Sequence, residues 1–427
     1  MAIPAPFCAS GPDDAVLVIG GGIVGLAQAY ALCRRGHAVR LFESGPDFAG
    51  RASHANGGHL STDSGAPWVS PSILPELVHW LFDRHRPLSV KPVAMGLAGW
   101  SWLLAARRHL GFDCYLESRR RLHALTDFSV TAWQRIETEL EAPLAPGRGV
   151  LYLYRNLREW NQAHRLLERE RMIGVQAVPV LAEEAPAYVP ELTASKIRPA
   201  GGIWYPGDRF GDCREAAHRL AGWVESHGGL LHRDTPVRAV ETIGGRVRIR
   251  TDHGLYTGVA VVIAAGVDSP ALTRPLGIPL RLCPVKGYTR TYAGSPLASS
   301  GPALADHSRK VVLTPLDRVL RVAGMAEFAG LDDRPVPRYF TRLHETATDW
   351  LPGLAQIPST LDWACLRAMT ADGLPLLGAT RRPGVFLNTG HGPLGWTLAA
   401  GTAELVADAI EGKGPVPGRT SASAAPA

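Results

Sequence analysis

The sequence has few lysines for a chain of its charge, and this shortage bears on its partners. Only five of its 45 basic residues are lysines (Lys91, Lys196, Lys286, Lys310 and Lys413), although its formal net charge is +6. The arginines are spread along the chain, and no basic stripe alternates with aromatic residues as in grooves that bind single strands. We therefore expect no nucleic-acid partner, and an anionic cofactor or substrate explains the charge equally well.

Cysteines are also scarce and widely scattered. The six of them form no CxxC pair, and no histidine stands at metal-ligand spacing from them. We expect reduced, buried thiols and no metal site. The opening MAIPAPFCASGPDD lacks both a basic and an apolar segment, so no secretory signal is predicted. The expected location is the cytoplasm, either free or attached to the inner face of the cell membrane.

No apolar run is long enough to span a bilayer as a helix, which takes ~20 residues. The longest one, Ala94 to Ala106, permits two interpretations. It is either a buried helix or a surface patch that touches lipid. The second interpretation depends on the basic residues around it, which are Arg84, Arg86, Lys91, Arg107 and Arg108.

The chain has 427 residues, of which 46% are hydrophobic. This is enough apolar content for a large core, and the length predicts two or three domains. The pattern predicts a strand at Val16 to Ile19, a helix from Ile23 to about Arg35 and a strand at Ala38 to Phe42. From about Leu231, short runs separated by Gly244-Gly245 and by 252–254 predict a β-meander. The small, Pro-rich tail 413–427 is expected to be disordered.

A glycine motif stands between the first strand and the first helix. In Gly20-x-Gly22-x-x-Gly25, the first glycine permits a tight turn, the second a close approach of a pyrophosphate, and the third close helix packing. The helix N-terminus favours phosphate, and Glu43 at the end of the next strand suits a ribose. An acid at this position disfavours a 2′-phosphate, so the motif predicts FAD or NAD rather than NADP.

Later segments separate these two cofactors. SHANGGHLS begins at Ser53, PVKGY ends at Tyr288, LRAMTADGLPLLG begins at Leu366, and LNTGHGPLGWT begins at Leu387. With the glycine motif, and in this order, they resemble the D-amino-acid oxidase-like flavoproteins, and among these the bacterial D-amino-acid dehydrogenase branch. The resemblance extends from about residue 15 to 412.

The resemblance implies an α/β (α+β) fold with non-covalent FAD. A Rossmann-like FAD-binding domain is expected from the discontinuous segments 14–62, 209–282 and 366–412. A substrate-binding domain with a large mixed or antiparallel sheet is expected from 63–208 and 283–365.

It also implies a reaction, oxidative deamination of D-amino acids to 2-oxo acids and ammonia. Hydride would pass from the substrate Cα to flavin N5, and electrons would continue to a quinone or other respiratory acceptor. Three alternatives remain open: a glycine or sarcosine-type secondary-amine oxidase, a non-catalytic FAD-holding electron-transfer subunit, and an NAD-dependent dehydrogenase.

Arg367 matches the family arginine that pairs with the substrate carboxylate, a role that suits a planar, permanently charged guanidinium. Its neighbours depart from the family pattern, with Ala368 in place of a proline and Cys365 in place of a glycine. A carboxylate-binding tyrosine of relatives is missing as well. Arg309 or Lys310 stands near that position, and either would bind a carboxylate or point to solvent.

Two further residues are candidates for catalysis. Tyr288 matches a tyrosine of the closest relatives and is expected either to line the pocket or to be a partly buried core aromatic. His59 is expected either to accept a proton from the substrate amine or to be an ordinary histidine, and the same alternatives hold for His54.

The remaining candidates are expected to bind FAD. The resemblance places some beneath the flavin, some beside the pyrophosphate or adenine, and the last group at a helix N-terminus facing flavin N1 and O2. The full set is Gly20, Gly21, Gly22, Ile23, Val24, Gly25, Glu43, Ser53, Asn56, Gly58, Val237, Ala265, Gly266, Gly390, His391, Gly392 and Gly395.

Overall fold

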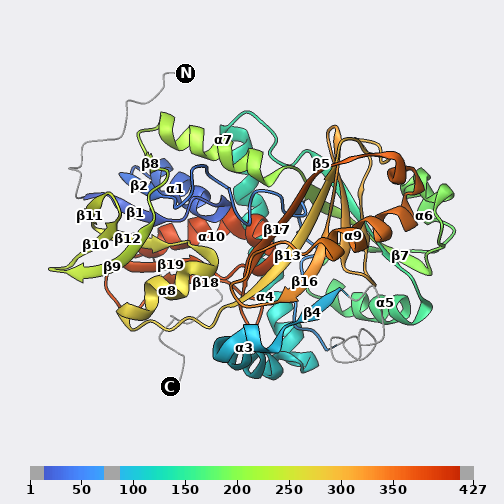
Figure 1. Cartoon of the computed structure of the whole chain (residues 1–427), viewed down its shortest axis with the longest axis horizontal. Helices are drawn as coiled ribbons and strands as arrows, with labels where there is room; N and C mark the ends of the chain where they lie inside the picture. The colour runs from blue at the N-terminus through green and yellow to red at the C-terminus, as the bar shows by residue number, and fades with distance from the viewer. Residues whose placement is uncertain (1–13, 72–86, 414–427) are drawn as a thin grey trace.

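The computed structural model describes residues 14–71 and 87–413. Within them the chain forms two large sheets at opposite ends of the molecule, with α10 between them (Figure 1). The architecture is mixed α/β, as predicted from the sequence. The expectations for arginines 84 and 86 and for the tail beyond residue 413 concern residues outside those described.

The smaller of the two sheets has six strands in the order β18-β19-β12-β1-β2-β8. All of its neighbouring pairs are parallel except β18–β19. Its strands are β1 (Val16–Ile19), β2 (Val39–Phe42), β8 (Leu230–His232), β12 (Ala260–Ile263), β18 (Leu376–Ala379) and β19 (Val385–Thr389). With α1 (Ile23–Arg34) between them, β1 and β2 confirm the predicted β-α-β unit to within one residue at each boundary.

Helices α1, α7 (Cys213–Ser226) and α10 (Gly395–Ile410) pack together beside this sheet. Every residue of β1 and β12 is buried, as expected of parallel strands that are covered on both faces. The predicted β-meander is confirmed as an antiparallel ribbon of β9 (Val237–Ile243), β10 (Arg246–Thr251) and β11 (Gly254–Gly258).

The larger sheet has ten strands, with the main order β17-β13-β16-β15-β14-β5-β7-β3. It is mixed, because β14–β5 and β16–β4 are parallel and the other pairs antiparallel. Its strands are β3 (His59–Leu60), β4 (Leu88–Val90), β5 (Gly147–Tyr154), β6 (Val178–Val180), β7 (Gly201–Phe210), β13 (Cys283–Tyr292), β14 (Ala303–Asp306), β15 (Val311–Leu316), β16 (Val319–Phe328) and β17 (Ser359–Met369). Helix α9 (Pro337–Trp350) covers one face.

The division into domains stays a prediction. The six-stranded sheet takes its strands from all three segments expected to form the FAD-binding domain. However, β7 and β17 run across the predicted boundaries at 208/209 and 365/366.

The apolar run lies in α3 (Pro92–Ala106) and is neither wholly buried nor wholly exposed. Met95 and Trp102 are buried, whereas Val93, Leu97 and Leu104 are 96%, 91% and 65% exposed. One face of this helix is therefore buried, as in the first interpretation, and the other is exposed, whereas contact with lipid stays a prediction. In the part of the chain that the structure covers, no helix has the length and hydropathy needed to cross a membrane.

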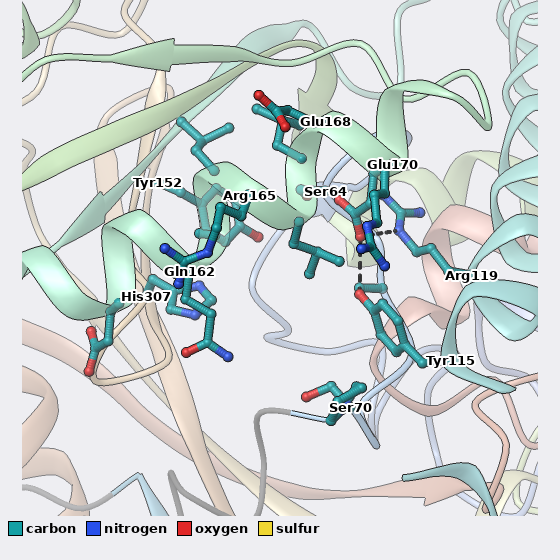
Figure 2. A pocket seen from close by; sticks show the side chains of 18 of the residues that line it. Ser64, Ser70, Tyr115, Arg119, Tyr152, Gln162, Arg165, Glu168, Glu170 and His307 are labelled. Carbon is teal, nitrogen blue, oxygen red and sulfur yellow. Dashed lines mark hydrogen bonds and ion pairs between the residues drawn. The ribbon is translucent and has the colours of Figure 1, made fainter. Parts of the chain in front are cut away.

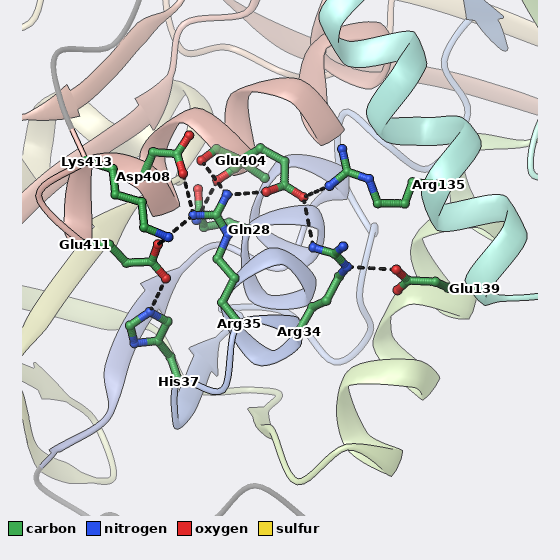
Figure 3. A network of polar contacts seen from close by, with 11 residues as sticks. Gln28, Arg34, Arg35, His37, Arg135, Glu139, Glu404, Asp408, Glu411 and Lys413 are labelled. Carbon is green, nitrogen blue, oxygen red and sulfur yellow. Dashed lines mark hydrogen bonds and ion pairs between the residues drawn. The ribbon is translucent and has the colours of Figure 1, made fainter. Parts of the chain in front are cut away.

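An ionic network joins the end of α1 to α10 and to α4 (Phe112–Glu139) (Figure 3). Arg35 contacts Glu404 and donates to Asp408 at 2.6 Å. Arg34 donates to Glu139 of α4 at 2.8 Å. Because the side chains of Arg35 and Glu404 are only 15% and 9% exposed, their attraction is screened less than that of a surface pair.

Candidate active site

The glycine motif forms the turn between β1 and α1. Gly20 has a φ of +111°, and a Cβ built there would lie 2.6 Å from the carbonyl oxygen of Ala264. A Cβ at Gly25 would lie 1.8 Å from the carbonyl oxygen of Gly20, so only glycine lets α1 approach the turn this closely. Gly22 is the N-cap, and no acidic residue lies in the first turn. This helix N-terminus can therefore receive an anion.

Glu43 and Ser53 flank this turn. The Glu43 carboxylate accepts the N–H of Gly21 at 2.6 Å and that of Gly45 at 2.9 Å. Ser53 Oγ accepts the N–H of Ile23 at 3.1 Å. The Ser44 hydroxyl also donates to this carboxylate, at 3.0 Å. Since a carboxylate has about four lone-pair positions, Glu43 keeps acceptor capacity for one ribose hydroxyl.

The second predicted contact segment joins the same edge of the sheet. Ala265 and Gly266 follow β12, the parallel neighbour of β1, and the carboxyl ends of neighbouring parallel strands meet at one edge. Gly266 has a φ of +55°, and its carbonyl oxygen accepts the hydroxyl of Thr389 at 3.3 Å. Val237 begins β9.

The third segment leads into α10. Gly390 and Gly392 have φ values of +79° and +57°, and Gly395 is the first residue of the helix. Between them, His391 is buried, with Nε2 3.2 Å from the hydroxyl of Thr402. Burial lowers the pKa of His391 to about 3. This histidine is therefore neutral at physiological pH and contributes no positive charge.

A cavity of about 450 Å³, which we call the central cavity, lies between the start of α10 and the large sheet. Four predicted site residues line it: Asn56, Gly58, His59 and Arg367. Its wall also contains residues that sequence reasoning did not single out, including Gly287, Thr289, Met325, Trp363 and Trp396. Their strands and loops are distant in sequence, and no local pattern marks them as neighbours.

Arg367 projects into the central cavity from β17. Its Nη1 donates to the carbonyl oxygen of Met325 at 3.2 Å, and among the described residues no carboxylate pairs with it. Burial lowers its pKa from the ordinary value, yet a guanidinium remains charged in proteins. Arg367 therefore offers a buried cation with donors left for an anionic ligand.

The departures beside Arg367 do not interrupt the strand. Ala368 pairs with Pro284 within the ladder between β17 and β13, and its side chain is buried. Cys365 lies on the cavity wall, and burial raises the pKa of its thiol. This thiol is therefore protonated at neutral pH.

His59 is held by Thr314. The Thr314 hydroxyl donates to the carbonyl oxygen of Gly57 at 2.7 Å, and His59 Nε2 lies 3.0 Å from the same hydroxyl oxygen. Because the hydroxyl proton is already used, Nε2 must be the donor, which leaves Nδ1 as the acceptor. Burial lowers the pKa of His59 to about 4. The other histidine considered, His54, packs against Trp363.

Tyr288 does not reach the central cavity. Its neighbours Gly287 and Thr289 line the cavity, and side chains alternate between the faces of a strand. The Tyr288 ring instead packs 4.7 Å from that of Tyr339 on α9, and its hydroxyl donates to Glu327 at 2.5 Å. Of the two expectations for this residue, the structure shows the core aromatic, and pocket lining is corrected.

Arg309 and Lys310 also take different positions. Arg309 donates to Asp349 at 2.9 Å, away from the cavity. Lys310 lines the central cavity, with Nζ 3.0 Å from Nε2 of His307. Of the two cations, only Lys310 thus lines the central cavity.

Comparisons with known proteins agree with this geometry. Residues 15–409 match the family model described as DAO, FAD dependent oxidoreductase. The chain is 35% identical over 410 residues to a D-amino acid dehydrogenase of Cereibacter sphaeroides, covering 94% of this chain and 92% of that protein. It is also 35% identical over 410 residues to one of Paramagnetospirillum magneticum, covering 93% and 95%.

The chain belongs to the DAO family of FAD-dependent oxidoreductases. Solved structures agree on the fold. Glycine oxidase from Bacillus cereus superposes with a TM-score of 0.73 at 20% identity, covering 94% of this chain and 96% of that one. L-proline dehydrogenase from P. horikoshii superposes with a TM-score of 0.71 at 20% identity, covering 95% of each chain.

The residues of this DAO-family chain fit FAD. The turn at Gly20 has no room for a side chain, and Glu43 stands beside it as an acceptor for one ribose hydroxyl. At the other end, Pro393 and Leu394 at the start of α10 line the central cavity, and the first turn of this helix carries no acid. A helix N-terminus stabilises negative charge at a bound flavin ring.

Proposed function

We propose that this enzyme oxidatively deaminates D-amino acids to 2-oxo acids and ammonia. The main support for this proposal is the position of Arg367. It is a buried cation in the central cavity, and its only hydrogen bond among the described residues goes to the carbonyl oxygen of Met325. A carboxylate is its natural partner, because a guanidinium binds the two carboxylate oxygens with two parallel hydrogen bonds. The two relatives named as D-amino acid dehydrogenases support the choice of substrate.

Arg367 and His59 have separate parts in this proposal. Bound FAD would supply the two-electron oxidation of the substrate C–H bond. Arg367 fixes the carboxylate and so orients that bond. The neutral His59, with a lone pair on Nδ1, is the candidate acceptor for the proton of the substrate amine. Tyr288 has no part, since it lies on the other face of the sheet.

Anaerobic reduction of the bound flavin by matched D- and L-amino acids tests this proposal. We expect D-alanine and other D-amino acids to bleach the flavin absorbance, and their L-enantiomers to leave it unchanged. Reduction by glycine, sarcosine or L-proline alone would identify a glycine oxidase or a secondary-amine oxidase instead. Failure of every amine would leave only the electron-transfer alternative.

We further propose that the reduced enzyme passes electrons to a quinone or other respiratory acceptor at the inner face of the cell membrane. The exposed face of α3 supports this. Val93, Leu97, Trp100 and Leu104 are between 50% and 96% exposed, and the exposed Arg107 and Arg108 follow them. An apolar stripe next to cations suits the boundary of an anionic bilayer.

Vesicle binding tests this contact. The wild-type enzyme should cosediment with phosphatidylglycerol-rich vesicles and far less with phosphatidylcholine vesicles. Leu97→Ser combined with Leu104→Ser should abolish the binding. Leu255→Ser is the matched control, because Leu255 is 59% exposed on β11. Equal binding by the double variant would contradict this surface.

A further inference from the structure

A second cavity of about 600 Å³ adjoins the central cavity. Its wall is rich in aromatic rings, which belong to Phe112, Tyr115, Tyr152, Tyr154 and Tyr205, and we call it the aromatic chamber. Figure 2 shows Tyr115 and Arg119 on one side of it, with Tyr152 and His307 on the other. The mechanism proposed above makes no use of this space.

The two cavities share part of their walls. Ala66, Tyr115, Tyr152, Leu166 and His307 line both of them. The two cavities are therefore adjacent at these residues. Leu166, on α5 (Leu157–Arg171), lies at the junction.

The segment 63–65, whose Ser64 lines both cavities, is rigidly held. Arg119, which is 1% exposed, donates to the carbonyl oxygen of Gly65 at 2.6 Å and also to that of Asp63. Asp208 accepts the N–H of Asp63 at 2.8 Å and that of Ser64 at 3.3 Å. With its backbone fixed from two sides, this segment keeps the chamber open, and rigid walls lower the entropic cost of binding.

The chemistry of the wall points to an aromatic ligand. Tyr152 and Tyr205 already form an edge-to-face pair with ring centroids 5.2 Å apart, the arrangement that a further ring extends favourably. The hydroxyls of Tyr154 and Tyr205 make no hydrogen bond to any residue that the structure describes. They are available to a polar atom on the ligand.

Charged side chains are a poor match for the buried part of this wall. The other charged residues that line it, Glu159, Arg165, Glu168 and Arg169, lie on α5 at exposed or half-buried positions. The buried carboxylate of Glu170 accepts Tyr115 at 3.0 Å and Arg119 at 3.1 Å. This carboxylate and this guanidinium neutralise each other, so the pair presents no net charge to a ligand. A charged group entering there would lose its hydration without a free counter-ion.

We propose that the aromatic chamber binds the substrate side chain, and that the enzyme prefers D-amino acids with large aromatic side chains to D-alanine. This rests on the proposed function. The central cavity has to hold the flavin ring, the carboxylate and the reacting carbon, so a long side chain has to leave it. The aromatic chamber is the adjoining space.

The test compares kcat/KM for D-phenylalanine, D-tyrosine and D-alanine in wild type and variants. We expect the aromatic substrates to be favoured about tenfold or more in wild type. Leu166→Trp should lower the ratio of D-phenylalanine to D-alanine by about tenfold, because it narrows the junction. Leu157→Trp, the same change at a 63% exposed position of α5, should leave the ratio unchanged.

A second variant keeps the proposal testable if Leu166→Trp does not fold. Tyr205→Phe removes only a hydroxyl and should reduce the preference for D-tyrosine over D-phenylalanine by about threefold or more. Oxidation of D-alanine without any gain for aromatic side chains would overturn the chamber but leave the proposed function. If no D-amino acid reduces the flavin, both proposals fail.

Discussion

Gly287 leaves the space through which Arg367 crosses its neighbouring strand. A Cβ built at Gly287 would lie 2.2 Å from Nη2 of Arg367. Strand β13, which carries the glycine, lies between β17 and β16. The guanidinium therefore passes over a bare stretch of β13 to donate to the carbonyl oxygen of Met325 on β16.

Gly287→Ala should therefore weaken substrate binding without removing the cofactor. We expect KM for D-amino acids to rise about tenfold, because the methyl group displaces the guanidinium, while the flavin spectrum stays unchanged. Gly353→Ala is the control, since a Cβ at Gly353 meets nothing within 4 Å. An unaltered KM in Gly287→Ala would contradict this relationship.

The pH profile of kcat should show no titration of His59 near neutrality. Burial lowers its pKa to about 4, so the imidazole stays neutral from pH 5 to 9. Substituting His59 with Gln should change the value of kcat but not the shape of its pH profile in that range. His218→Gln, at a 39% exposed position, is the control. A limb near pH 6.5 that disappears in His59→Gln would contradict the neutral imidazole.

Asp208 should make the enzyme less stable as pH rises from about 4 to 6. Burial raises its pKa to about 6 from 3.8, so the folded state binds the proton more tightly than the unfolded state. Stability is full below pH 3.8, and on the order of 3 kcal/mol is lost as pH rises through the folded pKa.

Asp208→Asn should remove this loss, because an amide has no proton to lose in this range. Unfolding midpoints in urea between pH 4 and 7 measure the effect. Asp317→Asn, with a side chain 90% exposed, should behave as wild type. Parallel pH curves for Asp208→Asn and wild type would show that burial does not perturb this carboxyl.

Local sequence patterns were sufficient to predict the fold of the nucleotide-binding side of the molecule. The apolar run Val16–Ile19, the glycines and the helical pattern after them are contiguous, so one stretch of sequence encodes a complete β-α-β unit. The meander was predictable for the same reason, since Gly244-Gly245 marks its first turn within the ribbon.

The central cavity was only partly predictable, because it depends on strand faces. Tyr288 and Gly287 are adjacent in PVKGY, yet only Gly287 faces the cavity. A register shift between Lys286 and Tyr288 marks an irregularity in β13, and no sequence pattern reveals which face follows such a shift. The family motif supplied Arg367 but not the orientation of its neighbours.

The aromatic chamber gave no signal in the sequence. Tyr115 lies on α4, Tyr152 and Tyr154 on β5, and Tyr205 on β7. Each tyrosine taken singly is an ordinary core residue, and only the pairing of β5 with β7 and the packing of α4 bring them together.

The proposed reaction depends most on Arg367 as the anchor of the substrate carboxylate. The direct test is anaerobic rapid mixing of the FAD-loaded enzyme with a D-amino acid over a range of concentrations. Arg367→Ala should retain FAD and raise the apparent Kd by about 100-fold or more. Arg290→Ala, on the far face of β13 and paired with Asp362, should bind as wild type. An unchanged Kd in Arg367→Ala would show that this guanidinium does not anchor the substrate carboxylate.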